Sequence, residues 1–115
     1  MFAVAITGSS AWASQYLFNT LAVFNGTNGQ YPYSALVIDD NGDFFGTTND
    51  GGALGVGTVF KVAADTHALR TLTTFNNMNG ANPYAGLILG TDGNLYGTTA
   101  SGGTNNMGTV FTVIQ

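Results

Sequence analysis

The sequence predicts an all-β protein of the propeller type, with two four-stranded blades in each chain. Three observations support this fold class: an internal repeat of 51 residues, an abundance of strand-forming and turn-forming residues, and a scarcity of charge. Aromatic residues make up 12% of the chain and charged residues only 7%, and there are 17 glycines. Thr, Val, Phe and Tyr favour pleated strands, whereas Gly, Asn and Asp favour tight turns. We therefore expect many short strands and no long helix.

The repeat is found when the chain is shifted against itself by 51 residues. Residues 21–62 then align with residues 72–113 without a gap, and 19 of the 42 positions are identical. The longest identical blocks are Gly-Thr-Thr and Gly-Thr-Val-Phe, which occur once in each copy. The expected organisation is an N-terminal strand and linker at 1–20, a first repeat at 21–62, a connection at 63–71 and a second repeat at 72–115.

Turn residues divide each repeat into four expected strands. The first strand ends at Phe24 or Phe75 and is followed by a loop rich in Asn and Gly. Asn-Gly or Asp-Gly, the strongest short hairpin signals, separates the second strand from the third. A glycine-rich turn leads to the fourth strand. The second, third and fourth strands are expected at 35–38, 44–48 and 58–62 in the first repeat, and at 86–89, 95–99 and 109–113 in the second.

The second and fourth strands of each repeat are apolar on both faces, which predicts that both faces are covered. Four-stranded units at this spacing, covered on both faces, are typical of propeller blades, with a β-solenoid or a β-sandwich as alternatives. Two blades cannot close a ring that needs four to eight. We therefore expect a homo-oligomer closed by a heterologous contact, and favour a trimer with six blades.

The N-terminal residues fit the repeat only in part. Residues 1–4 resemble the end of a strand from a preceding repeat, and the surplus at 7–15 has no counterpart in the second copy. A signal peptide is not predicted, because the start has no basic residues and its apolar run is short.

Charge and composition exclude several classes of partner. The formal net charge is −4, and Lys61 and Arg70 are the only lysine and arginine. A basic footprint for nucleic acid is missing, and an anionic membrane surface is disfavoured for the same reason. No stretch approaches the ~20 apolar residues of a membrane span. The chain contains no cysteine, which rules out disulfides and thiolate ligands, and no cofactor is expected.

The repeat unit resembles a known family. Its motif runs Asn-Gly-x-x-Pro-Tyr-x-x-Leu and then Asp-Gly-Asn-Leu-Tyr-Gly-Thr-Thr-x-x-Gly-Gly, most clearly at residues 79–111. In the first copy, Phe44 and Phe45 replace the Leu-Tyr pair. This pattern is similar to the Gloeo/Verruco (GloVer) tandem repeat of bacterial, mostly secreted or surface-anchored proteins. The resemblance implies a repeat architecture and a secreted or cell-surface location. It implies no catalytic motif.

A few residues could support chemistry. His67 is the only imidazole and lies near Asp65, so it could act as a general base; the structural alternative, which we favour, is a turn residue in an exposed connection. Residues 39–43 have the oxygen density of a weak calcium loop through Asp39, Asp40 and Asp43, against the favoured interpretation as a hairpin turn. Because the chain has no Glu, a glycosidase pair would need Asp50 with Asp40 or Asp43.

Carbohydrate binding is the other candidate activity. Tyr33 and Tyr84 each follow a proline and share their loops with Asn28 and Asn79. Aromatic faces beside amide groups suit sugar rings, while tyrosines packed between blades are the structural alternative. The expected function is therefore a non-catalytic repeat module that self-assembles and binds glycans or other surface ligands. The alternative is a glycosidase-like hydrolase with an Asp-based site at a blade or subunit junction.

Overall fold

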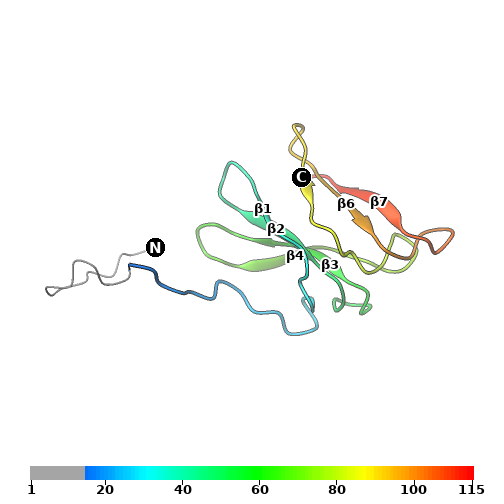
Figure 1. The fold of residues 1–115 in the computed structure, drawn as a ribbon, viewed down its shortest axis with the longest axis horizontal. Coiled ribbons are helices and arrows are strands. Elements are labelled where there is room, and N and C mark those ends of the chain that lie inside the picture. The colour runs from blue at the N-terminus through cyan, green and yellow to red at the C-terminus, as the bar shows by residue number, and fades with distance from the viewer. Residues whose placement is uncertain (1–14) are drawn as a thin grey trace, which may run out of the picture.

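The computed structural model describes residues 15–115, which form two antiparallel sheets and no helix (Figure 1). The first sheet has the order β1-β2-β3-β4 and the second the order β5-β6-β7. The all-β prediction is confirmed. The strands are β1 (Val37–Ile38), β2 (Phe44–Thr48), β3 (Thr58–Val62), β4 (Leu69–Thr74), β5 (Ile88–Leu89), β6 (Leu95–Thr99) and β7 (Thr109–Val113).

Four strands lie where the sequence predicts them. β2, β3, β6 and β7 have the predicted bounds, and a tight turn precedes both β2 and β6. β1 and β5 lie inside the predicted strands but pair over only two residues each. Before β1, the chain contacts β2 through side chains: the hydroxyl oxygens of Ser34 and Thr47 are 3.0 Å apart. The predictions for residues 1–4 and for most of 7–15 fall outside the described residues.

β4 belongs to a different sheet from the one that the repeat boundaries suggest. The strand ending near Phe75 was expected to open the second repeat, yet it pairs with β3 and completes the first sheet. The reason is the short turn between β3 and β4, where Ala63 N–H donates to Ala68 O at 3.0 Å and His67 N–H donates to Ala63 O at 2.9 Å. A hairpin this tight returns the chain directly onto its neighbour. The second sheet is left with three strands.

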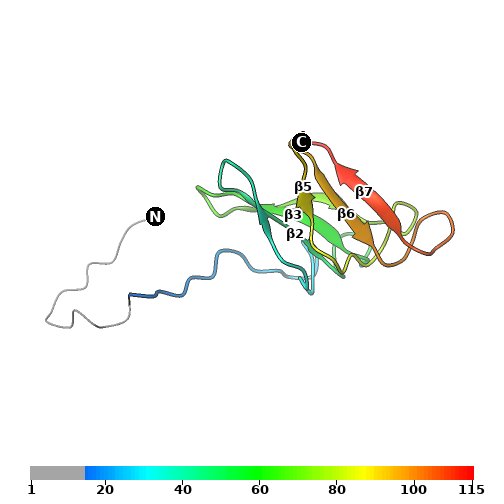
Figure 2. The same ribbon diagram turned by 45° about the horizontal axis from the view of Figure 1, so that its top comes forward.

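The hydrophobic core lies between the two sheets. Phe45 and Val59 come from one face of the first sheet and meet Phe75, Leu87 and Leu95 of the second repeat. The two short strands β1 and β5 are in contact. Figures 1 and 2 show the two sheets together, with residues 15–20 extending away from them. No helix among the described residues is long and apolar enough to cross a membrane.

The repeated glycines form turns, and the repeated threonines form hydrogen-bonded pairs across the sheets. Gly51 and Gly102 have φ angles of 75° and 76°, a left-handed conformation that side chains disfavour. A Cβ on Gly51 would lie 2.6 Å from the backbone oxygen of Gly26. Thr48 and Thr58 face each other across the sheet with hydroxyl oxygens 2.8 Å apart, and Thr99 and Thr109 repeat this pair at 2.8 Å. These positions explain much of the identity between the two copies.

The expectation that both faces of the apolar strands are covered holds for β3 but not for β7. Val59 of β3 is 0% exposed, whereas its counterpart Val110 is 82% exposed. No strand among residues 15–115 covers the outer face of the second sheet. On the opposite face of the first sheet, Phe24 packs on Phe60, and the rest of this face forms an open apolar groove. This groove has a volume of about 400 Å³ and is lined by Leu21, Ala22, Phe24, Pro32, Ser34, Leu36, Phe44, Phe60 and Val62.

Candidate functional site

Three exposed tyrosines form a row across the two repeats, which we call the tyrosine patch (Tyr31, Tyr33 and Tyr84). The ring centroids of Tyr31 and Tyr33 are 6.0 Å apart with an interplanar angle of 26°, and those of Tyr33 and Tyr84 are 6.1 Å apart at 21°. Their exposed fractions are 50%, 63% and 58%. The structure therefore brings Tyr33 and Tyr84 together, at the surface, and adds a third ring.

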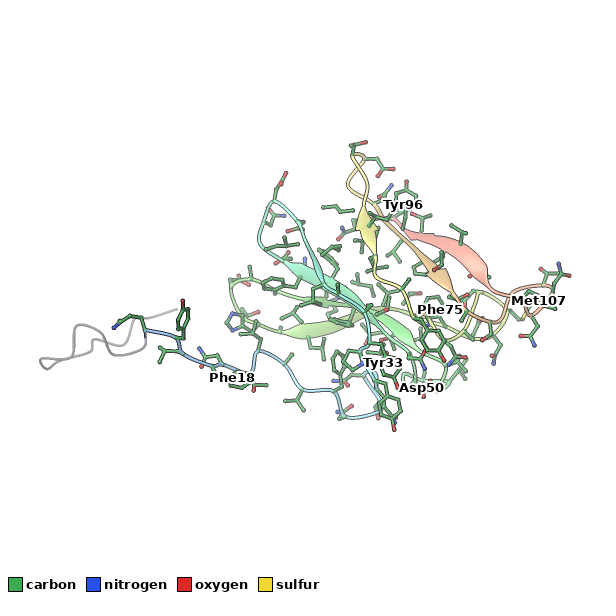
Figure 3. The ribbon with its side chains drawn as sticks, viewed as in Figure 1. Phe18, Tyr33, Asp50, Phe75, Tyr96 and Met107 are labelled. Carbon is green, nitrogen blue, oxygen red and sulfur yellow. The ribbon has the colours of Figure 1, made fainter. Side chains whose placement is uncertain are left out.

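The loop backbone fixes the position of the patch. Tyr31 has a φ of 58°, and its carbonyl oxygen accepts a hydrogen bond from Asn49 N–H at 2.9 Å. The neighbouring Gln30 exchanges two backbone hydrogen bonds with Asp50. This left-handed turn at Tyr31, just before Pro32, lies where the Tyr31 ring stacks on the Tyr33 ring. Figure 3 shows Tyr33 and Asp50 at the same end of the first sheet.

Asn28 and Asn79, the predicted amide partners of the tyrosines, are engaged in their own turns. The Asn28 side-chain oxygen accepts from Asn25 N–H at 2.9 Å, and the Asn25 side-chain oxygen accepts from Asn28 N–H at 3.0 Å. Asn76 and Asn79 repeat this reciprocal arrangement. Each turn thereby satisfies backbone donors that no strand partner reaches. We therefore assign both asparagines to loop structure and look elsewhere for polar groups.

A polar cluster beside the tyrosine patch joins the two repeats. Asn82 donates its amide to the Asp50 carboxylate at 3.0 Å and to the Asn49 carbonyl at 3.1 Å. Asn49 also donates to the Asp50 carboxylate at 2.8 Å, and Ser101 donates to the Asn82 side-chain oxygen at 3.0 Å. The side-chain oxygen of Asn49 is buried and accepts no hydrogen bond from residues 15–115. Because it has no exposed surface, it is an unsatisfied acceptor inside the cluster rather than a contact for a surface ligand.

The carboxylates proposed for a glycosidase pair are far apart. Asp43 precedes β2 and Asp50 follows it, so at about 3.3 Å per residue they lie on the order of 20 Å apart. The two carboxyl groups of a glycosidase are roughly 5–9.5 Å apart. Asp40 lies in the turn before Asp43 and hence at the same distant end. The geometry does not bring Asp50 together with either predicted partner.

Asp39 and Asp43 stabilise the hairpin turn before β2. The Asp39 carboxylate accepts from the backbone N–H of Asn41 at 2.9 Å and of Asp43 at 3.0 Å. Lys61 forms an ion pair with Asp43 at 2.6 Å, and this hydrogen-bonded contact, with a second bond from Ala64 N–H, lowers the pKa of Asp43. Asp39 and Asp40 line an open groove of about 510 Å³ shared with the turn before β6. No group of three potential metal-ligating side chains occurs in the described part of the chain.

His67 lies in the turn between β3 and β4. It is exposed and has a φ of 58°, and its backbone N–H closes the turn onto Ala63. That turn is at the Asp43 end of the first sheet, since Ala64 N–H donates to the Asp43 carboxylate at 2.8 Å. His67 is therefore remote from Asp50 and the tyrosine patch.

Sequence reasoning missed Tyr31 and Asn82, and for one reason. The two residues occupy equivalent positions in the repeats, so the alignment pairs a tyrosine with an asparagine and hides both. Both share the positive φ of this loop, at 58° and 54°. The Tyr-Pro-Tyr sequence at 31–33 was the available signal, because it places two aromatic side chains in one short loop.

The fold and site define an all-β tandem-repeat protein with an exposed aromatic surface. The profile of the Gloeobacter/Verrucomicrobia repeat matches residues 9–115, which is nearly the whole chain. The chain belongs to this repeat family, as the sequence motif indicated. No curated protein matches it.

Proposed function

We propose that this chain is a non-catalytic repeat module whose tyrosine patch binds carbohydrates. The observation that carries the proposal is the row of three stacked tyrosine rings, each at least half exposed. Exposed aromatic side chains grouped together are unusual on a surface with no binding task. Their rings offer flat apolar area and their hydroxyls offer hydrogen bonds, a combination that suits the apolar face and hydroxyl rim of a sugar.

The surroundings of the patch support a neutral, hydroxylated ligand. The cluster of Asn49, Asp50 and Asn82 supplies an oxygen acceptor in the half-buried carboxylate of Asp50, to which a sugar hydroxyl can donate. Lys61 and Arg70 lie away from the patch, on β3 and β4. Recognition of an anionic ligand therefore has little support.

The proposal includes self-assembly into a propeller-like ring. Two antiparallel sheets packed face to face are the expected subunit of such a ring, and each keeps one apolar face open. Three copies would supply six sheets, within the usual range of propellers. Light scattering on a gel-filtration peak tests this, with an expected mass near three times 11.9 kDa. A stable monomer at working concentration contradicts it.

Carbohydrate binding is tested with alanine variants of the patch. Tyr33→Ala and Tyr84→Ala are expected to weaken binding of a neutral polysaccharide about tenfold or more, which corresponds to about 1.4 kcal/mol. The matched control is Tyr16→Ala, since Tyr16 is also exposed but lies outside the patch. A glycan array selects the ligand and calorimetry measures its affinity. Unchanged affinity in both patch variants, or no glycan binding by the wild type, contradicts the proposal.

A further inference from the structure

The two sheets end differently at their outer edge. In the first sheet β4 pairs with β3, with Val59 opposite Thr73 and Lys61 opposite Arg70. In the second sheet β7 is the equivalent of β3, and it pairs on one side only, with β6. No strand among residues 15–115 occupies its other side. An open edge strand exposes unpaired backbone donors and acceptors that favour the addition of another strand.

The repeat itself identifies a segment that matches this vacant edge. Counting back 51 residues from β4 gives residues 18–23, so Phe18 and Leu21 correspond to Leu69 and Leu72. This segment is extended and pairs with no strand among the described residues. Phe18 is 92% exposed and Val23 is 71% exposed. Figures 1 and 2 show the start of the segment leading away from both sheets, and Figure 3 places Phe18 in this outlying part.

We propose that residues 18–23 of one copy of the chain add to β7 of a second copy as the missing fourth strand of its second sheet. The inference rests on the self-assembly in the proposed function and specifies how the copies join. The β3–β4 pairing transfers its register directly, including the bulge that falls at Leu21. The predicted pairs are Thr109 with Val23, Val110 with Ala22, Phe111 with Thr20, Thr112 with Asn19 and Val113 with Phe18.

The open faces of the two sheets support the same arrangement. Within one chain, the first-sheet face with Phe45 and Val59 packs on the second-sheet face with Leu87 and Leu95. The faces left open are the repeat equivalents of these two. Tyr96 and Val110 are exposed or half-exposed on the second sheet, while Phe44 and Leu36 line the groove of the first. A second copy stacked in the same way covers both faces at once.

The strand and the groove form one continuous surface. Leu21 and Ala22 belong to the segment and also line the groove, and Phe24 follows directly after them. Docking the outer face of one copy into the groove of the next therefore brings β7 alongside residues 18–23. The same movement buries apolar area and completes a backbone ladder. The contact is heterologous, so repetition closes a ring or extends a filament.

The partner is a second copy rather than the chain's own β7. Phe24 packs edge-on against Phe60, with ring centroids 4.9 Å apart. This contact is on the face of the first sheet that points away from the second sheet, because Phe60 and Val59 alternate in direction along β3. The segment therefore ends on the far side of the first sheet, where Phe24 follows it. Reaching its own β7 would require breaking the Phe24–Phe60 contact.

Disulfide cross-linking tests the register, and the chain is suited to it because it contains no cysteine. Single variants Ala22→Cys, Asn19→Cys, Val110→Cys and Thr112→Cys are prepared separately and mixed in pairs under mild oxidation. The matched mixtures, Ala22→Cys with Val110→Cys and Asn19→Cys with Thr112→Cys, are expected to give a covalent dimer. The crossed mixtures serve as controls, because their Cα atoms would lie beyond the roughly 7 Å that a disulfide spans.

The outcomes separate the strand addition from the assembly itself. Dimers in the matched mixtures, at least about tenfold faster than in the crossed ones, support the proposed register. Equal rates in all mixtures overturn it. An oligomeric mass without matched cross-links overturns the strand addition but leaves the assembly standing, whereas a monomeric mass overturns both. The double variant Ala22→Cys/Val110→Cys adds a further check, because a monomer closed by an internal disulfide would show that the chain pairs with itself.

Discussion

The two repeats share most of their key residues but expose them in opposite ways. Leu87 of the second repeat is 5% exposed, whereas its counterpart Leu36 in the first is 54% exposed. On the other face the order is reversed, since Val59 is 0% exposed and Val110 is 82% exposed. The side chains at each pair of positions are the same. The difference therefore comes from which face of each sheet has a neighbour.

Each face of the repeat is therefore covered in one of the two copies, although neither copy is covered on both faces within a single chain. Leaving the open leucine and valine of each pair in water costs about 25 cal/mol per Å² of exposed apolar surface. The first repeat lacks a neighbour on its groove side and the second on its outer side. The face that is buried in one repeat is therefore the face that is open in the other.

The largest expected effect contrasts Leu87→Ala with Leu36→Ala. Leu87→Ala should lower the free energy of unfolding by about 2–5 kcal/mol, because it leaves a cavity in the core between the sheets. Leu36→Ala should cost less than about 1 kcal/mol in an isolated chain, because its side chain is more than half exposed. Urea unfolding measures both.

Measuring the two stability costs at several protein concentrations extends this comparison. If a second copy covers the groove, the cost of Leu36→Ala grows as the protein is concentrated, because association stabilises the folded chain by mass action. The cost of Leu87→Ala should stay constant over the same range. A Leu36→Ala effect that is equally small at every concentration argues against a covered groove.

A smaller effect is expected at the polar junction of the repeats. Asn82→Gly removes the amide that bonds Asp50 but tolerates the φ of 54° at this position, and should cost about 1–3 kcal/mol. Asp50→Asn keeps the size of the side chain and should be milder. Thermal unfolding measures both variants. Loss of a hydrolytic activity in Asp50→Asn at unchanged stability would contradict the junction role and favour a catalytic one.

The smallest expected effect is on the pH dependence of stability, where a lysine–aspartate contact in the first repeat corresponds to a tyrosine–aspartate contact in the second. The Lys61 contact lowers the pKa of Asp43, and in the second repeat the Tyr96 hydroxyl, 2.5 Å from the Asp92 carboxylate, lowers the pKa of Asp92. A depressed carboxyl pKa contributes stability above the unfolded value, near 3.9, that is lost as pH falls through the folded value. Lys61→Gln and Tyr96→Phe should each flatten this acid limb of the stability curve.

The basic limb distinguishes the two contacts. The bond to Asp92 raises the pKa of Tyr96 above its usual 10.0. That contribution is present below the unfolded pKa of Tyr96 and is lost as pH rises through the folded value. Tyr96→Phe should therefore also flatten the curve above about pH 10, whereas Lys61→Gln should leave the tyrosine contribution there intact. Unfolding midpoints measured from pH 2 to 11 test both statements.

Part of the candidate site could be predicted from the sequence. The Pro-Tyr pair repeats at a fixed spacing, which marked Tyr33 and Tyr84, and the structure stacks these two rings. Asn28 and Asn79 were marked by the same repetition, yet their side-chain oxygens accept backbone N–H bonds within their own turns. Repetition identifies positions that matter to the unit, and it does not separate a residue that shapes a loop from one that faces a ligand.

The sequence by itself determined the class of fold, the positions of the long strands and the turns between them. These features follow from local chemistry: β-branched and aromatic residues favour strands, and glycine alone accepts the backbone of Gly51 and Gly102. Only the tertiary structure decided that β4 joins the first sheet, that Asn82 bonds Asp50, and which faces stay open. Those outcomes depend on contacts between residues far apart in the chain. A strand carries the same side chains whether or not a neighbour covers it.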